Sequence, residues 1–552
     1  MDFELGLAFT GTVSAGAYAG GVIDFIIEAL EEWQKEKDAN RAQFGDNYSQ
    51  WKVPWHNVVI KGLSGASGGG VSCGLILNTI GKQFDHVHTP ADAESAHNDF
   101  YNAWVEQLGI EQLLAIDDLT GGEIKALLNA DAIPAIADKL LVNDNFGNNF
   151  PRPYIDGNLI AMLTLTNLRG IPYILQFKSI LQQNIIYYRN TDYAKFELAT
   201  NNASVHPDAI LIPYDTSGVA FANGYSLLKA ACLCTCAFPG AFKAQPFNQP
   251  STVYAARPDG KNINPLNKPA YSFLSSDGGV LNTEPFMLLH DAITPTATGG
   301  TYDDKHNPRS PQDVVRSIIM VAPLEVAEVF DEDGYDITKD GLLSIIKPVI
   351  FAMRQDALFS DEEISLAFNE DIYSRFMISP VRNSLPTAND VITPAITGTS
   401  VGTFGAFLSK DFREHDYFLG RRNAQQFFRR HFAVPVDEAS ANPIFGPLNI
   451  RAQFSNYIFN DGIDYFSIIP LCGTASTEAY YPQWPTGKGY SEDNIRQLLT
   501  GRVDKLCDAV EASLGLGWLK KIIASVVINE VKSTLIDDIM NAVEKSLKDS
   551  KL

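Results

Sequence analysis

Cysteine is scarce in this sequence, which has 6 cysteines among 552 residues. So sparse a set cannot form the disulfide framework that holds many secreted proteins together, and we expect a cytoplasmic protein. Cys232, Cys234 and Cys236 alternate, but this spacing differs from the C-x-x-C of a metal site, and no histidine lies close by in the sequence. We therefore predict small buried residues here and no metal.

Positive charge is also in deficit, because 43 Lys and Arg stand against 65 Asp and Glu, and 43 − 65 gives a net charge of −22. A surface of this charge repels polyanions at long range, so we do not expect nucleic acid as a partner. The same charge disfavours unaided attraction to an anionic membrane. A local basic patch can override the average, so peripheral membrane contact stays open.

Long apolar runs are missing as well. No stretch of about 18 uninterrupted apolar residues is present, which is the length that a membrane-spanning helix needs. Asp2 and Glu4 stand where a secretion signal would carry positive charge. We predict neither a spanning helix nor a signal. With 45% hydrophobic and 20% charged residues, the composition is that of a globular protein, and its length favours about two to four packing units.

The most informative stretch runs from Val58 to Leu77, with the sequence VVIKGLSGASGGGVSCGLIL. An apolar run of strand length, Val58–Leu63, is followed by a turn of small residues, and Val71–Leu77 then continues as an apolar segment suited to a buried helix. The order predicted is strand, sharp turn and helix.

Within the turn, Gly65 to Gly69 form a G-x-S-x-G pattern centred on Ser67. In a nucleophile elbow the flanking glycines allow a strained turn that exposes the serine hydroxyl at the start of a helix. Ser64 does not fit the pattern, because the residue two positions after it is Ala66. A glycine-rich turn of this kind also occurs in phosphate-binding sites, or simply lets a helix pack on a sheet.

A second strand, loop and helix precede this stretch. Leu5–Phe9 is predicted as a strand, and a loop of small residues leads to a helix for which Ser14 is a candidate N-cap. The helix should bury one face and turn Glu28, Glu31 and Glu32 towards water. Two such units before residue 80 predict the α/β class, a sheet with crossover helices.

The remaining segments give a coarse organisation. We predict a helical insertion or cap over residues 81–158, and two strands, Leu159–Thr166 and Ile171–Phe177, joined across residues 167–170. Residues 384–405 favour a surface connection. A boundary near residue 330 would separate a domain at residues 1–330 from a mostly helical region at residues 331–552. The predicted helix Leu227–Ala237 and strand Val314–Val321 belong to the first part.

A serine hydroxyl needs a base to become a nucleophile. None of the nine histidines lies in an obvious strand-end loop of the first 330 residues, so we expect surface or structural histidines. Asp277 follows a short apolar run, Tyr271–Leu274, and precedes two glycines, which is a setting suited to a catalytic aspartate. Asp-Gly-Gly is also common in simple turns.

Four segments together resemble the patatin-like phospholipase family, including bacterial patatin-related proteins. They occur in the family's order over about residues 5–325: FTGTVSAGAYAGGV (Phe9–Val22), GASGG (Gly65–Gly69), AFPGAFKAQPF (Ala237–Phe247) and DGGVLNTEPF (Asp277–Phe286). The resemblance implies a three-layer α/β/α serine hydrolase fold with a mostly helical C-terminal region.

By this resemblance Ser67 is the nucleophile and Asp277 the base of a Ser-Asp dyad that cleaves fatty-acyl esters through an acyl-enzyme. The backbone N–H groups of Gly11, Thr12 and Gly68 would form the oxyanion hole. The implied substrate is a phospholipid or lysophospholipid, and no cofactor or metal is needed. The loop Gly11–Gly16 departs from the family, since it lacks two glycines and a basic side chain, but backbone donors survive such substitutions.

The altered loop leaves two alternatives open. One is a catalytically silent patatin-fold scaffold or binding protein, and the other is an acyltransferase that passes the same acyl-enzyme to an alcohol. A homo-oligomer also stays open.

Two segments lie outside the dyad. Phe404–His431 concentrates arginines among phenylalanines, which suits either pairing with the protein's own carboxylates around an aromatic core or contact with lipid headgroups. Trp518–Leu552 carries an apolar stripe at helical spacing, formed by Ile528, Val531, Leu535, Ile539, Val543 and Leu547. Its net charge of +1 is low for an interfacial helix, so we predict that it packs against the protein or a second copy.

Overall fold

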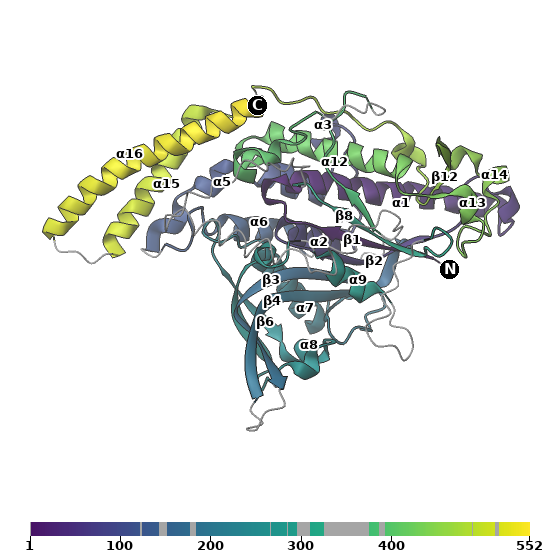
Figure 1. Ribbon diagram of the computed structural model, residues 1–552, viewed down its shortest axis with the longest axis horizontal. Helices are drawn as coiled ribbons and strands as arrows, with labels where there is room; N and C mark the ends of the chain where they lie inside the picture. The colour runs from purple at the N-terminus through teal and green to yellow at the C-terminus, as the bar shows by residue number, and fades with distance from the viewer. Residues whose placement is uncertain are drawn as a thin grey trace, which may run out of the picture.

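The computed structural model describes residues 2–121, 124–142, 152–176, 184–264, 266–283, 285–294, 310–324, 375–385, 392–487, 489–513 and 518–552. In these residues a nine-stranded sheet forms the centre of the molecule (Figure 1). Its strands are β1 (Phe3–Phe9), β2 (Val58–Gly65), β3 (Ile155–Gln176), β4 (Asn184–Ala199), β5 (Ile210–Pro213), β6 (Gln245–Pro250), β7 (Ala270–Asp277), β8 (Arg316–Val321) and β9 (Arg375–Ile378).

The sheet is mainly parallel. Its order is β5-β4-β3-β2-β1-β8-β9, and β7 pairs with both β3 and β6. The pairs β3–β2, β2–β1, β1–β8, β8–β9 and β4–β5 are parallel, whereas β3–β4, β3–β7 and β6–β7 are antiparallel. Parallel neighbours require crossover connections, and helices follow β1 and β2. The predicted α/β class is confirmed.

The helices of the described residues fall into three groups. Those next to the sheet are α1 (Gly16–Phe44), α2 (Gly68–Thr79), α7 (Val219–Thr235), α8 (Ser251–Ala256) and α9 (Phe286–Ile293). The segment between α2 and β3 contributes α3 (Pro90–Ala93), α4 (Asp99–Tyr101), α5 (Ile110–Leu114) and α6 (Ala132–Leu140). The C-terminal part contributes α12 (Lys410–Arg430), α13 (Val436–Ala439), α14 (Ile450–Gln453), α15 (Glu492–Ser513) and α16 (Trp518–Asp549), with a small sheet of β10 (Ala433–Pro435), β11 (Ile458–Asp461) and β12 (Ile463–Ser467).

Successive side chains of β1 point to opposite faces of the sheet, and helices pack on both faces. Leu5, Leu7 and Phe9 enter the main core together with residues of α1. Gly6 and its neighbour Ala8 point to the other face, where α9 lies. A Cβ on Gly6 would fall 3.0 Å from Leu289 of α9, so the missing side chain lets that helix approach the sheet. Period-two alternation of this kind is what a sheet covered on both faces requires.

The first helix, α1, is covered by α12, which lies alongside it (Figure 1). A Cβ on Gly21 would fall 1.9 Å from the backbone oxygen of Tyr417, and one on Gly420 would fall 2.2 Å from that of Tyr18. Among the described residues, Val13–Phe44 is a segment long and apolar enough to cross a membrane, but 94% of its apolar window is buried inside the protein. Both glycines therefore serve helix–helix packing in a core.

One core joins the two sides of the predicted boundary. The main cluster of buried apolar side chains contains Phe3 near one end of the chain and Ala475 near the other. Residue 330 itself lies outside the described residues, so the boundary there stays a prediction.

Three local predictions near α1 and β3 are wrong. Ser14 is not an N-cap: a 3₁₀ turn at Val13–Ala15 precedes α1, and Ser14 Oγ donates to the backbone oxygen of Thr403 at 2.6 Å. Glu28 is fully buried instead of facing water. The two strands predicted around Gly170 are one strand, β3, with an irregular register between Thr166 and Ile171 where Gly170 has φ +78°.

The predictions for the insertion, for residues 384–405 and for the C-terminal region have mixed outcomes. The described residues between 81 and 142 contain short helices, whereas β3 begins at Ile155, so the predicted helical stretch of residues 81–158 ends too late. Residues 143–151 lie outside the description. The proposed surface connection at 384–405 is wrong in its second part, because Ile396, Thr397 and Ser400 are buried. α15 and α16 form a helical pair that extends from the body of the molecule (Figure 1), as the predicted helical C-terminus requires.

The stripe predicted on the last helix is buried in part. Met540, Val543 and Leu547 of α16 pack with residues of α15 and with Phe412. Leu535, which was predicted to belong to the stripe, is 45% exposed. Packing of α16 against the protein is confirmed for its last four turns.

Candidate functional site

Ser67 sits at a sharp turn between β2 and α2. Its backbone has φ 53° and ψ −127°, a conformation that costs a non-glycine residue free energy and persists only when the surroundings impose it. Here the surroundings are backbone: a Cβ on Gly65 would fall 2.3 Å from the oxygen of Gly69, and one on Gly69 would fall 2.5 Å from the oxygen of Phe9. The predicted elbow is therefore present, and its flanking glycines allow the close approach.

Asp277 meets Ser67 across 210 residues of sequence. Ser67 Oγ donates to Asp277 Oδ2 at 2.6 Å, and the N–H of Gly279 donates to the other oxygen, Oδ1, at 2.6 Å. Thr166 Oγ1 holds the backbone of Asp277 by donating to its carbonyl oxygen at 2.7 Å. Both members of the pair are buried, with 8% of Ser67 and 2% of Asp277 exposed. The carboxylate is thus fixed in position to accept the serine proton.

The predicted oxyanion residues surround the same serine. A Cβ on Gly11 would fall 3.7 Å from Ser67 Cβ, and one on Gly68 would fall 2.0 Å from Thr12 Oγ1. Within the described residues, the backbone N–H groups of Gly11, Thr12 and Gly68 donate to no other atom of the chain. Free donors beside a serine hydroxyl, one of them at the start of α2, suit a developing oxyanion.

Two polar groups near the elbow were not predicted. The N–H of Ser67 donates to Thr235 Oγ1 at 3.1 Å, which ties the elbow to the end of α7. Thr12 Oγ1 is fully buried and has no hydrogen-bond partner among the described residues. Neither feature carries a sequence signal, because a threonine in an apolar helix or a loop has many uses.

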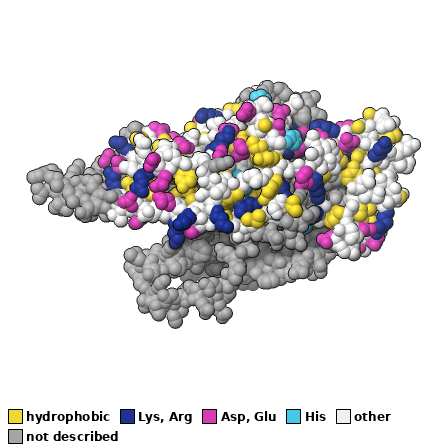
Figure 2. Space-filling view, turned by 90° about the horizontal axis from the view of Figure 1, so that it is seen from above, with side chains coloured by type: hydrophobic (Ala, Val, Ile, Leu, Met, Phe, Trp, Pro, Cys, Tyr) yellow, Lys and Arg dark blue, Asp and Glu magenta, His cyan; other side chains and the backbone are white. Residues whose placement is uncertain are grey.

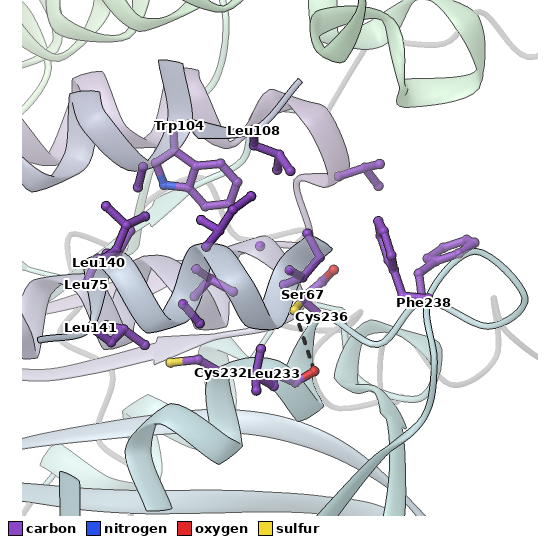
Figure 3. A pocket seen from close by; sticks show the side chains of 18 of the residues that line it. Ser67, Leu75, Trp104, Leu108, Leu140, Leu141, Cys232, Leu233, Cys236 and Phe238 are labelled. Atoms are coloured by element: carbon purple, nitrogen blue, oxygen red, sulfur yellow. Dashed lines mark hydrogen bonds between the residues drawn. The ribbon is translucent and has the colours of Figure 1, made fainter. Parts of the chain in front are cut away.

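A narrow apolar pocket of about 100 Å³ opens beside Ser67. Figure 3 shows Leu75, Leu140 and Leu141 on one side of it and Leu108 and Phe238 on the other, with Ser67 between them. The wall comes from α2, α6, α7 and the segment around Trp104, and the full lining is Val13, Ser67, Gly68, Val71, Leu75, Ala103, Trp104, Leu108, Ile133, Ile136, Ala137, Leu140, Leu141, Cys232, Leu233, Cys236, Phe238, Phe242 and Phe407. Sequence alone did not predict it, since its apolar residues resemble any core.

The cysteines of α7 belong to this apolar environment. Cys232 and Cys234 are buried, and burial raises the pKa of each thiol above its usual range. Cys236 is partly buried and lines the pocket. The prediction that these are small buried residues is confirmed for Cys232 and Cys234.

The histidines lie elsewhere. In the part of the chain that the structure describes, none hydrogen-bonds to Ser67. His56 is buried against the backbone oxygen of Ile468, and burial lowers its pKa to about 3. His86 and His88 contact the acidic face of α1, where they pair with Asp24 and Glu28 respectively. For these three, the expectation of structural histidines is confirmed.

The arginines of α12 mostly meet the protein's own groups. Arg421 bonds to both Asp24 and Glu28, and Arg413 donates to the backbone oxygen of Val105 at 2.9 Å. Arg429 pairs with Glu478. Internal pairing is therefore confirmed for these arginines, and for the buried Arg413 and Arg421 contact with lipid headgroups is wrong.

No family model matches this chain. The uncharacterized protein y4iI of Sinorhizobium fredii (strain NBRC 101917 / NGR234) is 28% identical to it over 600 residues, an alignment that covers 98% of this chain and 81% of the relative. The relative's name assigns no activity. Because the alignment covers nearly all of the chain, both the elbow region and the C-terminal helices fall within the shared length.

Proposed function

We propose that this protein is a patatin-like serine hydrolase that cleaves fatty-acyl esters, with a phospholipid or lysophospholipid as substrate. The observation that carries the proposal is the 2.6 Å hydrogen bond from Ser67 Oγ to Asp277 Oδ2 at the mouth of an apolar pocket. A buried serine with a dedicated carboxylate partner is the arrangement of a nucleophile and its base. The resemblance of four sequence segments to the patatin-like family supports the same reaction.

The reaction divides into two halves. Ser67 Oγ attacks the carbonyl carbon of the ester while Asp277 takes the hydroxyl proton, and the carbonyl oxygen becomes an oxyanion that accepts hydrogen bonds from the N–H groups around Gly11, Thr12 and Gly68. As the tetrahedral intermediate collapses, the carbon–oxygen bond to the alcohol breaks and Asp277 returns its proton to the departing oxygen. Water then attacks the acyl-enzyme, with Asp277 again as base, and releases the fatty acid and free Ser67.

The pocket supports an acyl chain as the group that is transferred. It is narrow and its lining is almost wholly apolar, so it favours an unbranched hydrocarbon over a ring or a charged group. Each methylene that leaves water for such a surface contributes about 0.8 kcal/mol to binding. The ester carbonyl would then lie beside Ser67 with the chain directed towards Leu140 and Leu141 (Figure 3).

A fluorophosphonate probe tests the nucleophile directly. We expect wild-type protein to be labelled on Ser67, and both Ser67→Ala and heat-unfolded wild type to stay unlabelled. A silent scaffold would leave folded wild type unlabelled. Product analysis with added glycerol then separates a hydrolase, which yields free fatty acid, from an acyltransferase, which yields a new glycerol ester.

A further inference from the structure

A second cavity lies on α12, far along the sheet from Ser67. It is a groove of about 990 Å³ between the edge strand β9, the second half of α12 and β11. Its lining includes the aromatic residues Phe376 and Phe459 and the basic residues Arg422, Arg429 and Arg430. The groove therefore combines basic and apolar walls in a protein whose net charge is −22.

Arg422 is the unusual member of this groove. It is 3% exposed, and its guanidinium lies 4.6 Å from the centre of the Tyr481 ring. Within the described residues it has neither an ion pair nor a hydrogen bond, and burial lowers its pKa from the usual value. A buried cation without a directly bonded carboxylate is costly, and an anion in the groove would offset that cost.

Several other buried arginines are paired with carboxylates. Arg421, its neighbour in sequence, binds Asp24 and Glu28, and Arg502 binds Asp118. Arg257 pairs with Asp192. Arg382 also has no carboxylate partner in the part of the chain that the structure describes, but it lies 3.8 Å from the ring of Trp484 and does not line the groove. Arg422 thus lines the groove without the carboxylate partner that Arg421, Arg502 and Arg257 each have.

Glu478 is the acidic group that acts on Arg422, and its charge offsets part of the effect of burial on the pKa of Arg422. Its oxygens are bonded to Arg429 and Gln426, and within the described residues no ion pair joins it to Arg422. Asp461 lines the groove but is exposed, as are His431 and Arg430. Burial lowers the pKa of His431, and the neighbouring Arg430 lowers it further. The basic groups therefore outnumber the free carboxylate of the lining.

We propose that this groove binds a phosphate group carried on a molecule with an apolar part, with Arg422 as the buried anchor and Arg430 at the rim. A guanidinium presents a planar pair of N–H donors that matches two phosphate oxygens, and one already ordered by an aromatic ring loses little freedom on binding. Phe376 and Phe459 would contact the apolar part. This site is separate from the chemistry at Ser67.

The helix dipole explains only part of the cluster. Basic residues in the last turn of a helix stabilise its C-terminal end, and Arg429 and Arg430 occupy that turn in α12. Arg422 lies two turns earlier, beyond the reach of this effect. The helix dipole therefore does not account for Arg422.

Calorimetric titration of the full-length protein with hexyl phosphate tests the proposal, with hexanol as the uncharged control. We expect saturable binding of hexyl phosphate that is tighter than that of hexanol, whose alkyl chain the apolar pocket beside Ser67 can also take. Arg422→Gln should weaken that binding about tenfold or more, since hydrogen bonds between charged groups are the strong ones. Arg430→Gln should weaken it several-fold, and Arg451→Gln, which removes an exposed arginine paired with Asp437 and Asp464, should leave it unchanged.

The source of the phosphate is separated by vesicles. Retention on phosphatidylcholine vesicles that contain phosphatidic acid, lost in Arg422→Gln, would identify a lipid headgroup, and binding of hexyl phosphate without such retention would identify a soluble ester. The proposal is overturned if hexyl phosphate does not bind at millimolar concentration, or if Arg422→Gln binds it like wild type. If Arg422→Gln does not fold, unchanged binding by Arg430→Gln overturns the proposal instead.

Discussion

Ser67 and Asp277 are joined by a hydrogen bond of 2.6 Å although 210 residues separate them in the sequence. β7 brings Asp277 to the site, because it pairs with β3, and β3 pairs in turn with the elbow strand β2. Both residues are buried, whereas turns of this kind are expected to be exposed. The pair is thus held by the sheet as much as by the two loops.

We expect Ser67→Ala and Asp277→Asn each to abolish ester hydrolysis while the protein stays folded. Asparagine keeps an oxygen for the N–H of Gly279 but cannot take the serine proton. Hydrolysis of a chromogenic acyl ester and circular dichroism would measure the two properties. Ser64→Ala is the matched control, since Ser64 donates to the backbone oxygen of Pro285 and should lose only about 1 kcal/mol of stability. Near-normal turnover by Asp277→Asn would contradict the dyad.

Position 11 in the loop Gly11–Gly16 should tolerate the methyl group of alanine but not the larger, branched side chain of valine. In Gly11→Ala the new Cβ would lie 3.4 Å from Thr283 Cγ2 and 3.7 Å from Ser67 Cβ, which is ordinary contact, so turnover should change little. Gly11→Val adds branches beside Ser67, displaces the backbone donors and should lower kcat on the order of a hundredfold. Equal rates for the two variants would show that the loop is not at the reacting carbonyl.

The hydroxyl of Thr12 offers a related test. Because this buried oxygen has no partner in the described chain, Thr12→Val should leave folding stability unchanged or raise it, and hydrolysis should persist if the backbone alone stabilises the oxyanion. Thr12→Gly removes a side chain packed against Gly68 and should cost more stability than an exposed glycine substitution would. A large loss of kcat in Thr12→Val would instead assign the hydroxyl a direct part in the reaction.

Chain-length preference should follow the volume of the pocket. Ala137→Phe places a ring on the α6 wall, so kcat/KM for a hexadecanoyl ester should fall at least about tenfold relative to a butanoyl ester, since each buried methylene is worth about 0.8 kcal/mol. Lys139→Phe, on the exposed side of the same helix, is the control and should preserve the ratio. A uniform loss on both esters would indicate damage to the fold rather than a shorter pocket.

Stability should fall at alkaline pH through His86. Burial opposes its charged form, but Asp24 and Glu31 outweigh burial and raise the pKa of His86 to about 9. His86 therefore binds its proton more tightly in the folded protein than in the unfolded chain, where its pKa is about 6.5. Its stabilisation is therefore complete below about pH 6.5 and is lost as pH rises through about 9, a change on the order of 3 kcal/mol.

Urea unfolding of wild type and His86→Gln at about pH 6 and pH 9.5 would measure this effect. The free energy of unfolding of wild type should exceed that of His86→Gln at about pH 6, and this difference should disappear at about pH 9.5. Burial lowers the pKa of Lys37 to about 8, which acts in the opposite direction above that pH, but Lys37 is common to both proteins and cancels in the difference. A constant difference between the two proteins would rule out the role of His86.

The last helix supplies a pair of positions with opposite surroundings. Met540 is fully buried against α15, whereas Leu535 is 45% exposed on the same helix. Met540→Asp, like truncation after Gly517, should lower the melting temperature or the solubility, because a buried carboxylate without a partner is costly. Leu535→Asp should be nearly neutral. Loss of liposome binding with unchanged stability in the truncated protein would favour a membrane role instead.

Surface charge bears on that alternative. On the face seen in Figure 2, acidic side chains are interspersed with the basic ones, and no broad basic region stands out. An interfacial helix usually presents a strongly basic polar face. The packing account therefore remains our expectation for α16.

Sequence predicted the local parts of this site and missed the distant ones. The elbow at Ser67 was predictable because its strand, glycines and helix are contiguous. Asp277 was a candidate because it follows a short apolar run and precedes two glycines, and the resemblance to a family gave it the role of base. The burial of Glu28 was not, because its partner Arg421 lies 393 residues away. Ser14 was misjudged for the same reason, since Thr403 accepts its hydroxyl across 389 residues. The pocket wall carried no signal, as apolar residues facing a cavity and a core are alike.

The contact between α1 and α12 has a consequence during synthesis. The backbone of α1 at Gly21 lies in close contact with the backbone of α12 at Tyr417. No other segment can therefore occupy that face of α1 once α12 is in place. On the ribosome, however, Phe44 is made 366 residues before Lys410, where α12 begins. At typical rates of about 5 to 20 residues per second, one face of an apolar helix stays uncovered for roughly 20 to 70 s. During that interval the apolar side chains of this face are exposed to solvent, which makes the unfinished chain prone to aggregation.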